Sequence, residues 1–372
     1  MSTSGITMIL IKLNLTNFLF NRFIYSLFTF FGVITLIFFL FNVLPGDPAQ
    51  MMLGQNENSE QLLNIKKKYG FDQPLDTQYL YYLNDLSPIS FHSNQEDNYT
   101  FLKENKYSAF ELIDLNSFTI VLKFPYLRTS FTMQGKKVSD IIKNTLPNTI
   151  ILAISAIIIA IILGILLGII SAVLKDSYID KSIQLISVIG MSLPSFFSAI
   201  LFAWFFGYVL NEYTNLEMTG SLYELDDFGE NYNIKLKNLL LPSIVLGIRP
   251  LAVISQLMRN ELLDVLNQDY IRTARAKGLS EYSVIKNHAI KNSLNPVVTA
   301  VSGWFASLLA GAVFVEYIFG WNGLGKEIVN ALNNLDLPVI MGSVLVIAFM
   351  FIIINILVDI IYAWLDPRVK LN

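Results

Sequence analysis

The sequence contains no cysteine, only two histidines and few charged residues. Without cysteine there can be no disulfide and no thiolate metal site, and His92 and His288 alone nearly exclude a zinc site built only from protein ligands. Charged residues make up 15% of the 372 residues, whereas soluble domains usually have about 25%. The formal net charge of −3 gives no reason to expect a nucleic-acid partner. We therefore expect neither catalysis nor a cofactor in this chain.

Long apolar runs are what the sequence has instead, with 53% hydrophobic residues. A membrane-spanning helix needs about 20 mostly apolar residues, and six stretches meet this requirement. They lie between Arg22 and Asp47, between Lys143 and Lys175, between Lys181 and Glu212, from Leu239 to Met258, from about Pro296 to Glu316, and from Leu337 to Val358. The first is too long and too aromatic for a cleaved signal peptide. The sequence predicts an all-α membrane protein with six transmembrane helices.

The distribution of Lys and Arg predicts how these helices are oriented. With the N-terminus in the cytoplasm, the cytoplasmic tails and short loops hold twelve basic residues, and the short external loops hold three. Positive charge in short loops favours the cytoplasmic side. Both termini are therefore expected in the cytoplasm. The polar and aromatic segment 47–142 is then an enlarged external loop, in which "SFTIVLKFPYLRTSF" alternates as a β-strand does.

A cytoplasmic stretch, "QDYIRTARAKGLSEYSVIKNHAIKNSLNP" (268–296), combines charges of both signs with apolar residues at helical spacing. Gly278 divides it, and a glycine there favours the end of one helix, while Ser280 and Glu281 favour the start of another. We expect two short amphipathic helices hinged at Gly278. Such a pair could lie on lipid, but the interspersed acidic residues favour docking into a groove on a soluble protein.

Several motifs, in order along most of the chain, resemble one transporter family. They are "FNVLPGDPA" (41–49), "GFDQPLDTQYLYYL" (70–83), "LPNTIILAI" (146–154), "VIGMSLPSFF" (188–197), "DVLNQDYIRTARAKGLSEYSVIKNHAIKNSLNPVVT" (264–299) and "LVDIIYAWLDPR" (357–368). The chain is similar to permease subunits of binding-protein-dependent ABC importers, in the dipeptide, oligopeptide and nickel branch. The resemblance implies the type I importer permease fold.

The resemblance also implies which residues couple movement of the ATPase to the membrane helices. In that family a cytoplasmic loop, here 259–295, inserts into a cleft of the ATPase subunit. The matching coupling residues are Arg272, Thr273, Ala274, Arg275, Ala276, Lys277, Gly278 and Leu279. The general permease motif begins Glu-Ala-Ala where this chain has Arg272-Thr273-Ala274, a departure usual for the peptide branch. Near the fifth span, "EYIFGWNGLGKEI" resembles the family's external turn, with Asn322 in place of the usual proline.

Two features of the spans themselves need a physical explanation. Arg249 lies in the middle of the fourth span, where a charge costs at least about 2.5 kcal/mol, so it must face protein or water. An acidic partner, a carbonyl freed by Pro250 and a role in the translocation pathway all remain open. Ala156, Ala160, Gly164, Gly168 and Ala172 recur at every fourth position. This spacing favours close helix packing within the subunit, or less favourably a sliding contact with a partner permease.

These observations predict four segments. Residues 1–46 form a cytoplasmic N-terminus with the first transmembrane helix, 47–142 the external loop, 143–364 the permease core with five helices and the coupling loop, and 365–372 a cytoplasmic tail. No "GxxxxGK[ST]" phosphate-binding loop occurs, so ATP would bind to partner subunits. The expected partners are a second homologous permease, two ATP-binding subunits, an extracytoplasmic substrate-binding protein and membrane lipid, in a bacterial inner membrane.

Other functions compete with an importer of di- or oligopeptides. Within the family, a nickel chelate or another small solute remains possible, although few histidines and no cysteines disfavour handling of bare metal. A secondary transporter would show repeated halves, and no internal repeat is visible. A membrane-anchored receptor or scaffold, working through 47–142, would have no use for the coupling loop.

Overall fold

The computed structural model describes residues 3–43, 49–50, 59–96, 98–103, 106–133, 135–226 and 228–365. The chain divides into two compact units. The core unit comprises Met1–Ser26, Thr145–Val329 and Phe349–Asn372, and the insert unit comprises Leu27–Asn144 and Asn330–Ala348. The motif "PGDPA" and the basic residues Arg368 and Lys370 lie largely or wholly outside the described residues.

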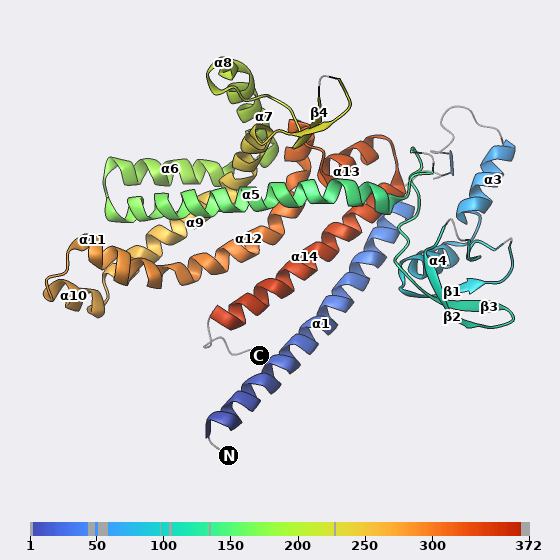
Figure 1. The fold of residues 1–372 in the computed structure, drawn as a ribbon, viewed down its shortest axis with the longest axis horizontal. Helices are drawn as coiled ribbons and strands as arrows, with labels where there is room; N and C mark the ends of the chain where they lie inside the picture. Colours follow the sequence, from blue (N-terminus) through green and yellow to red (C-terminus); the bar gives the residue numbers. More distant parts are fainter. Residues whose placement is uncertain are drawn as a thin grey trace. The chain divides into compact units, whose positions relative to one another are not determined.

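Three long helices have residues in both units. They are α1 (Thr3–Val43), α5 (Val138–Val173) and α14 (Leu337–Leu365). The other long helices, α9 (Lys237–Leu266) and α12 (Ile290–Phe319), belong to the core unit. Within the core unit α9 packs against α6 (Tyr178–Ser192), α7 (Ser195–Trp204) and α12 (Figure 1).

The described residues contain four helices long and apolar enough to cross a membrane, located at Asn21–Asn42, Val138–Val173, Lys237–Leu266 and Leu337–Val358. Two bent pairs bring the number to six if each pair is one span. The apolar run predicted as a span between Lys181 and Glu212 is a bent pair in the structure, in which Tyr178–Ser192 and Ser195–Val209 meet at 113°. Leu193 has an extended backbone, with ψ of 132°, as the residue before a proline prefers. The second pair, Glu281–Val298 and Gly303–Phe319, bends by 51°.

The stripe of small residues packs α5 against α9 inside the core unit. A Cβ at Gly168 would lie 2.6 Å from the carbonyl oxygen of Ser255 and from the Cβ of Met258. One at Gly164 would lie 2.8 Å from Ile254. Ala156, Ala160 and Ala172, the alanines of the stripe, are buried in the apolar core of this unit. The prediction of close packing within the subunit is confirmed.

Short elements complete the core unit. The π-helical turn η1 (Phe205–Val209), α8 (Asn211–Thr214), and the antiparallel strands β4 (Tyr223–Leu225) and β5 (Tyr232–Ile234) lie between α7 and α9. After α9 come α10 (Asp269–Ala276), α11 (Glu281–Val284) and the π-helical turn η2 (Ile285–Ala289). Helix α13 (Leu324–Asn333) follows α12.

The insert unit contains a small sheet beside two helices. Helices α3 (Ser59–Tyr69) and α4 (Leu75–Leu86) precede strands β1 (Ile89–Ser93), β2 (Ala109–Asp114) and β3 (Phe118–Lys123). The order is β1-β3-β2, all antiparallel, with Ile89 opposite Leu122 and Ala109 opposite Lys123. β3 confirms the strand predicted from "SFTIVLK". Apolar packing joins Ile37 and Phe38 of α1 to Tyr82 of α4 and Met341 of α14.

Candidate functional site

Helix α10 ends at a glycine in the left-handed conformation. Gly278 has φ of 80°, its N–H donates to the carbonyl of Arg275 at 2.9 Å, and the N–H of Leu279 donates to Ala274 at 3.4 Å. This pair of hydrogen bonds is a Schellman motif, which satisfies the last carbonyls of a helix. The predicted glycine hinge is confirmed as a local structure.

The chain enters α11 immediately after this hinge. The Ser280 hydroxyl accepts a hydrogen bond from the N–H of Ser283 at 3.4 Å, which makes Ser280 the N-cap. The predicted helix start is confirmed. Arg275 of α10 then donates to both carboxylate oxygens of Glu281, at 2.8 and 3.2 Å. Although exposed pairs stabilise a protein little, a bidentate pair fixes relative orientation, here between α10 and α11.

One face of the two-helix segment is buried. Ile271, Ala274 and Val284 are at most 7% exposed and pack with Met258 and Leu262 of α9. Their side chains therefore join the segment to α9 by apolar packing. Ala274, expected among the coupling residues, contributes to this inner face.

The other face is open to a partner. Seven of the eight predicted coupling residues are exposed, namely Arg272, Thr273, Arg275, Ala276, Lys277, Gly278 and Leu279. Two aromatic residues that the sequence did not single out lie on the same segment: Tyr270 is 44% exposed and Tyr282 is 73% exposed. Large aromatic residues on a polar surface favour a protein interface. The available signal was their place in the matched motif 264–299, two residues before Arg272 and three after Leu279.

A buried ion pair lies near the base of this segment. Asp180 of α6 is 1% exposed and accepts hydrogen bonds from Nε and Nη2 of Arg259 of α9, at 2.8 and 2.7 Å. The Ser171 hydroxyl of α5 and the Gln184 amide also donate to the Asp180 carboxylate. These contacts bind α5, α6 and α9 together close to where α9 enters the two-helix segment. No periodic pattern indicated this cluster, because Arg259 lies 79 residues from Asp180 in the chain.

Arg249 has a backbone partner in the core unit. Its Nε donates to the carbonyl oxygen of Met191 at 3.3 Å, near the end of α6, where the break before Pro194 interrupts the helical hydrogen-bond pattern. The carbonyl that binds Arg249 thus belongs to a neighbouring helix and is not one freed by Pro250. Arg249 is exposed rather than packed into the protein, and no other hydrogen bond joins its guanidinium to the described residues.

The turn after α12 is organised by a buried carboxylate. Glu316 is fully buried and accepts from the N–H groups of Gly325 and Lys326 at 2.7 and 3.2 Å. A Cβ at Gly323 would lie 2.3 Å from this carboxylate, so a side chain there would displace it. The tight turn expected in "EYIFGWNGLGKEI" is confirmed, and Gly320 ends α12 with φ of 67°.

Comparison with known proteins identifies the family of this chain. The family model described as "Binding-protein-dependent transport system inner membrane component" matches residues 164–371, and the model of the N-terminal part of such membrane components matches 15–95. The chain belongs to this family. It is thus a permease of the ABC importer class and a multi-pass inner membrane protein, from a family that works with ATPase and substrate-binding proteins.

Individual relatives extend over almost the whole chain. A dipeptide transport system permease protein of Alkalihalophilus pseudofirmus is 33% identical, covering 91% of this chain and 95% of the relative. A putative peptide transport system permease protein of Brucella abortus is 35% identical over 91% of this chain and 94% of its own length. A di/tripeptide transport system permease protein of Pseudomonas aeruginosa is 31% identical over 92% and 95%.

A solved chain of the MetNI methionine ABC transporter, in an inward-facing conformation, also resembles this structure. It has a TM-score of 0.49 and 13% identity, covering 61% of this chain and 96% of that chain.

Proposed function

We propose that this chain is the membrane-spanning subunit of an ATP-driven importer that translocates di- or oligopeptides. The observation that carries the substrate class is the set of relatives described above, which are peptide permeases by name and align with more than nine-tenths of this chain. The chain itself has no catalytic activity and no cofactor in this proposal, since ATP binds to its partners.

The exposed face of α10 and α11 is the ATPase-docking surface in this proposal. Arg272, Arg275 and Lys277 supply charge, and the small residues around Gly278 allow close approach. The buried Ile271 and Ala274 join this surface to α9. Movement of an ATPase cleft would thus be transmitted through packed side chains and the Asp180–Arg259 pair to the membrane helices.

The assembly contains a second homologous permease, two ATP-binding subunits and an extracytoplasmic substrate-binding protein. Both termini and the docking surface face the cytoplasm, as the excess of Lys and Arg in the corresponding loops favours. Arg249 faces the translocation pathway, where its exposed guanidinium attracts the carboxylate of a passing peptide.

Uptake in a strain lacking this gene tests the proposal. Labelled di- and tripeptides should enter cells only when the gene is restored, and uptake of a nickel chelate should not depend on it. The membrane protein should also copurify with an ATP-binding subunit. Uptake of nickel chelate without peptide uptake would replace the substrate class, and purification without an ATPase would contradict the importer assignment.

A further inference from the structure

The insert unit contains a large cleft remote in sequence from the docking surface. Its volume is about 1030 Å³, slightly above the usual upper limit of about 1,000 Å³ for small-molecule binding sites. It is lined by the end of α3, by Tyr81 of α4, and by residues of the loops before β2 and after β3. All of these residues belong to the insert unit, so the cleft is a feature of that unit alone.

The lining of the cleft has an excess of positive charge. Four cationic side chains line it, against two carboxylates: the cations are Lys67, Lys103, Lys106 and Arg128, and the carboxylates are Asp72 and Glu96. Arg128 and Lys106 are partly buried, whereas Asp72 and Glu96 are exposed. The tyrosines Tyr69, Tyr81, Tyr99 and Tyr126 supply aromatic surface. A ligand with an anionic end inside and a cationic end outside would complement this distribution.

Arg128 is held in place by the buried carboxylate of Asp85, which it contacts through Nε. Its Nε donates to Asp85 at 3.2 Å, and the hydroxyls of Tyr99 and Tyr107 donate to the same carboxylate at 2.9 Å each. The two terminal nitrogens of Arg128 have no acceptor among the described residues, although its side chain is only 16% exposed. They can therefore donate two further hydrogen bonds to a planar carboxylate.

The backbone at Arg128 is also unusual. Its φ of 66° lies in the left-handed region, which a residue with a long side chain rarely adopts. Such a conformation persists where the surroundings impose it, and it often occurs at binding sites. Here the carbonyl of Arg128 accepts from the N–H of Val138 at 3.0 Å, while its side chain is held by Asp85.

Two lysines near Asp85, of which Lys106 lines the cleft and Lys123 does not, add to the positive charge of Arg128. Lys106 lies 3.7 Å from the centre of the Tyr99 ring, and Lys123 donates to the backbone carbonyl of Asp85. Burial lowers the pKa of each lysine to about 8, in spite of the Asp85 carboxylate nearby. One carboxylate therefore faces three cations, and an added anion would reduce their mutual repulsion.

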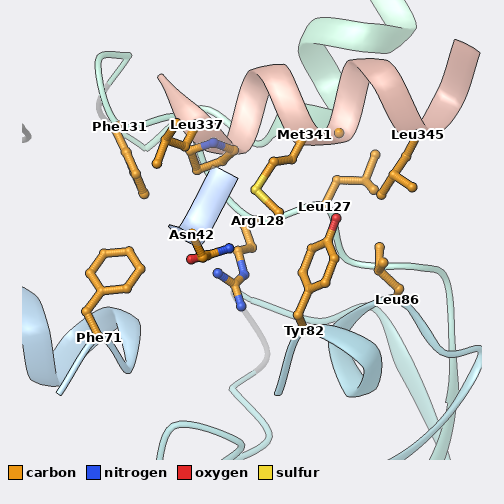
Figure 2. A pocket seen from close by; sticks show the side chains of 12 residues that line it. Asn42, Phe71, Tyr82, Leu86, Leu127, Arg128, Phe131, Leu337, Met341 and Leu345 are labelled. Carbon is orange, nitrogen blue, oxygen red and sulfur yellow. The ribbon is translucent and has the colours of Figure 1, made fainter. Parts of the chain in front are cut away.

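A second cavity in this unit does not offer the same site. It has a volume of about 20 Å³, enough for about one water molecule, and Figure 2 shows that its walls include Phe71, Leu127 and Met341. Arg128 lines both cavities. Of these two cavities, which are lined by described residues, the large cleft has room for an organic ligand.

We propose that the large cleft of the insert unit binds a short zwitterionic peptide, with its C-terminal carboxylate on Arg128 and Lys106 and its ammonium group near Asp72 and Glu96. The tyrosines contact the peptide side chains. Inorganic phosphate would satisfy Arg128 but would gain nothing from the two exposed carboxylates or from the aromatic surface. The choice of a peptide rests on the proposed function, whereas the preference for a carboxylate rests on the cleft itself.

Binding to the purified importer complex in nanodiscs, without its substrate-binding protein, tests this site. Isothermal titration with a tripeptide should detect binding that weakens at least tenfold when the peptide is amidated at its C-terminus. Acetylation of its N-terminus should weaken binding by a smaller factor. In a complex that also carries Arg249→Gln, which removes the arginine of the translocation pathway, Arg128→Gln should remove the preference for the free carboxylate. Lys136→Gln in the same background, which changes an exposed lysine outside the cleft, should retain it.

A second variant covers the case in which Arg128→Gln does not fold, since it removes a partner of buried Asp85. Lys106→Gln leaves the Arg128–Asp85 pair intact and should weaken tripeptide binding at least threefold. Equal affinities for free and amidated peptide, or unchanged affinity in a folded Arg128→Gln or Lys106→Gln complex, would overturn the site. Phosphate that binds as tightly as tripeptide would overturn the peptide class.

Peptide uptake measured in cells with the same variants separates this inference from the proposed function. If peptide uptake depends on this gene but no peptide binds to the cleft, the site is refuted and the proposed peptide importer stands. Carboxylate-selective binding without any peptide uptake would refute the peptide importer, and with it the peptide class of this ligand.

Discussion

Gly278 is the residue at which the chain turns from α10 toward α11, and its left-handed backbone limits what can replace it. A Cβ there would meet nothing within 4 Å, yet φ is +80°, so the cost of a substitution is conformational rather than steric. Valine is strongly disfavoured at such an angle, whereas asparagine tolerates it. The two substitutions therefore separate backbone strain from loss of the glycine itself.

We predict that Gly278→Val leaves membrane insertion intact and reduces substrate-stimulated ATP hydrolysis by at least tenfold, because α10 and α11 no longer present one docking surface. Gly278→Asn should retain most of the stimulation. The measurement is ATPase activity of the assembled complex with and without loaded binding protein. Stimulation near the wild-type level in Gly278→Val would show that this hinge is not needed for coupling.

Arg249 carries a prediction about the translocation pathway. Because its one hydrogen bond to the described protein is to the Met191 carbonyl, at 3.3 Å, its charge is available to a peptide carboxylate. Loss of one hydrogen bond to a charged group costs about 1.5 kcal/mol, or roughly tenfold. Arg249→Gln should therefore lower uptake of free peptides about tenfold and that of C-terminally amidated peptides much less, at normal protein levels.

One control variant and two alternative outcomes decide how this result is interpreted. Arg249→Lys keeps the charge and should retain most of the difference between the two kinds of peptide. If Arg249→Gln is lost from the membrane, the contact with Met191 is structural. If both kinds of peptide slow equally, recognition of the carboxylate at Arg249 is wrong.

Single residues also show how far the sequence could be interpreted. Gly278 and Ser280 could be assigned to a helix end and a helix start, because those preferences are local. The burial of Ala274 and the pairing of Asp180 with Arg259 could not be assigned, because they depend on which helices become neighbours. Arg249 could be identified as unusual from its depth in the span, but its partner Met191 required the neighbouring helix to be placed.

At the scale of elements, the close approach of α5 to α9 depends on residues without large side chains. We predict that Gly168→Ala destabilises the protein by about 1–3 kcal/mol, because its Cβ would lie 2.6 Å from the Ser255 carbonyl oxygen. The apparent melting temperature of the detergent-solubilised complex should fall. Gly303→Ala in α12 is a matched control: its Cβ would meet nothing within 4 Å, and alanine is the better helix former. A Gly168→Ala protein as stable as Gly303→Ala would contradict the tight contact.

The sequence predicted which segments form long helices better than it predicted where those helices end or bend. Long apolar runs identified α5, α9 and α14, since span length is set by bilayer thickness. The break before Pro194 was present as "SLPSFF", but a proline can kink a membrane helix or end it, and the sequence alone did not distinguish the two. In the insert unit, β3 was predicted from alternation, whereas β1 and β2 depend on pairings between distant segments.

At the scale of the whole molecule, the arrangement of the chain across the membrane is the property on which the docking role depends. If the docking surface faced outward, no cytoplasmic ATPase could reach α10 and α11. The excess of Lys and Arg, twelve against three in tails and short loops, favours a cytoplasmic docking surface and an external segment between η1 and α9. The absence of cysteine from the whole sequence makes this arrangement directly measurable.

We predict opposite labelling of single cysteines introduced at Asn231 and Asn287, both of which are exposed in the structure. In sealed cells, a membrane-impermeant maleimide should react with the cysteine at 231 and leave the one at 287 unmodified. Both should react after permeabilisation, which shows that neither is shielded by the protein. Reaction at 287 in sealed cells would place α11 and η2 outside the cytoplasm, reverse the orientation expected from the charges, and remove the physical basis for coupling through Gly278.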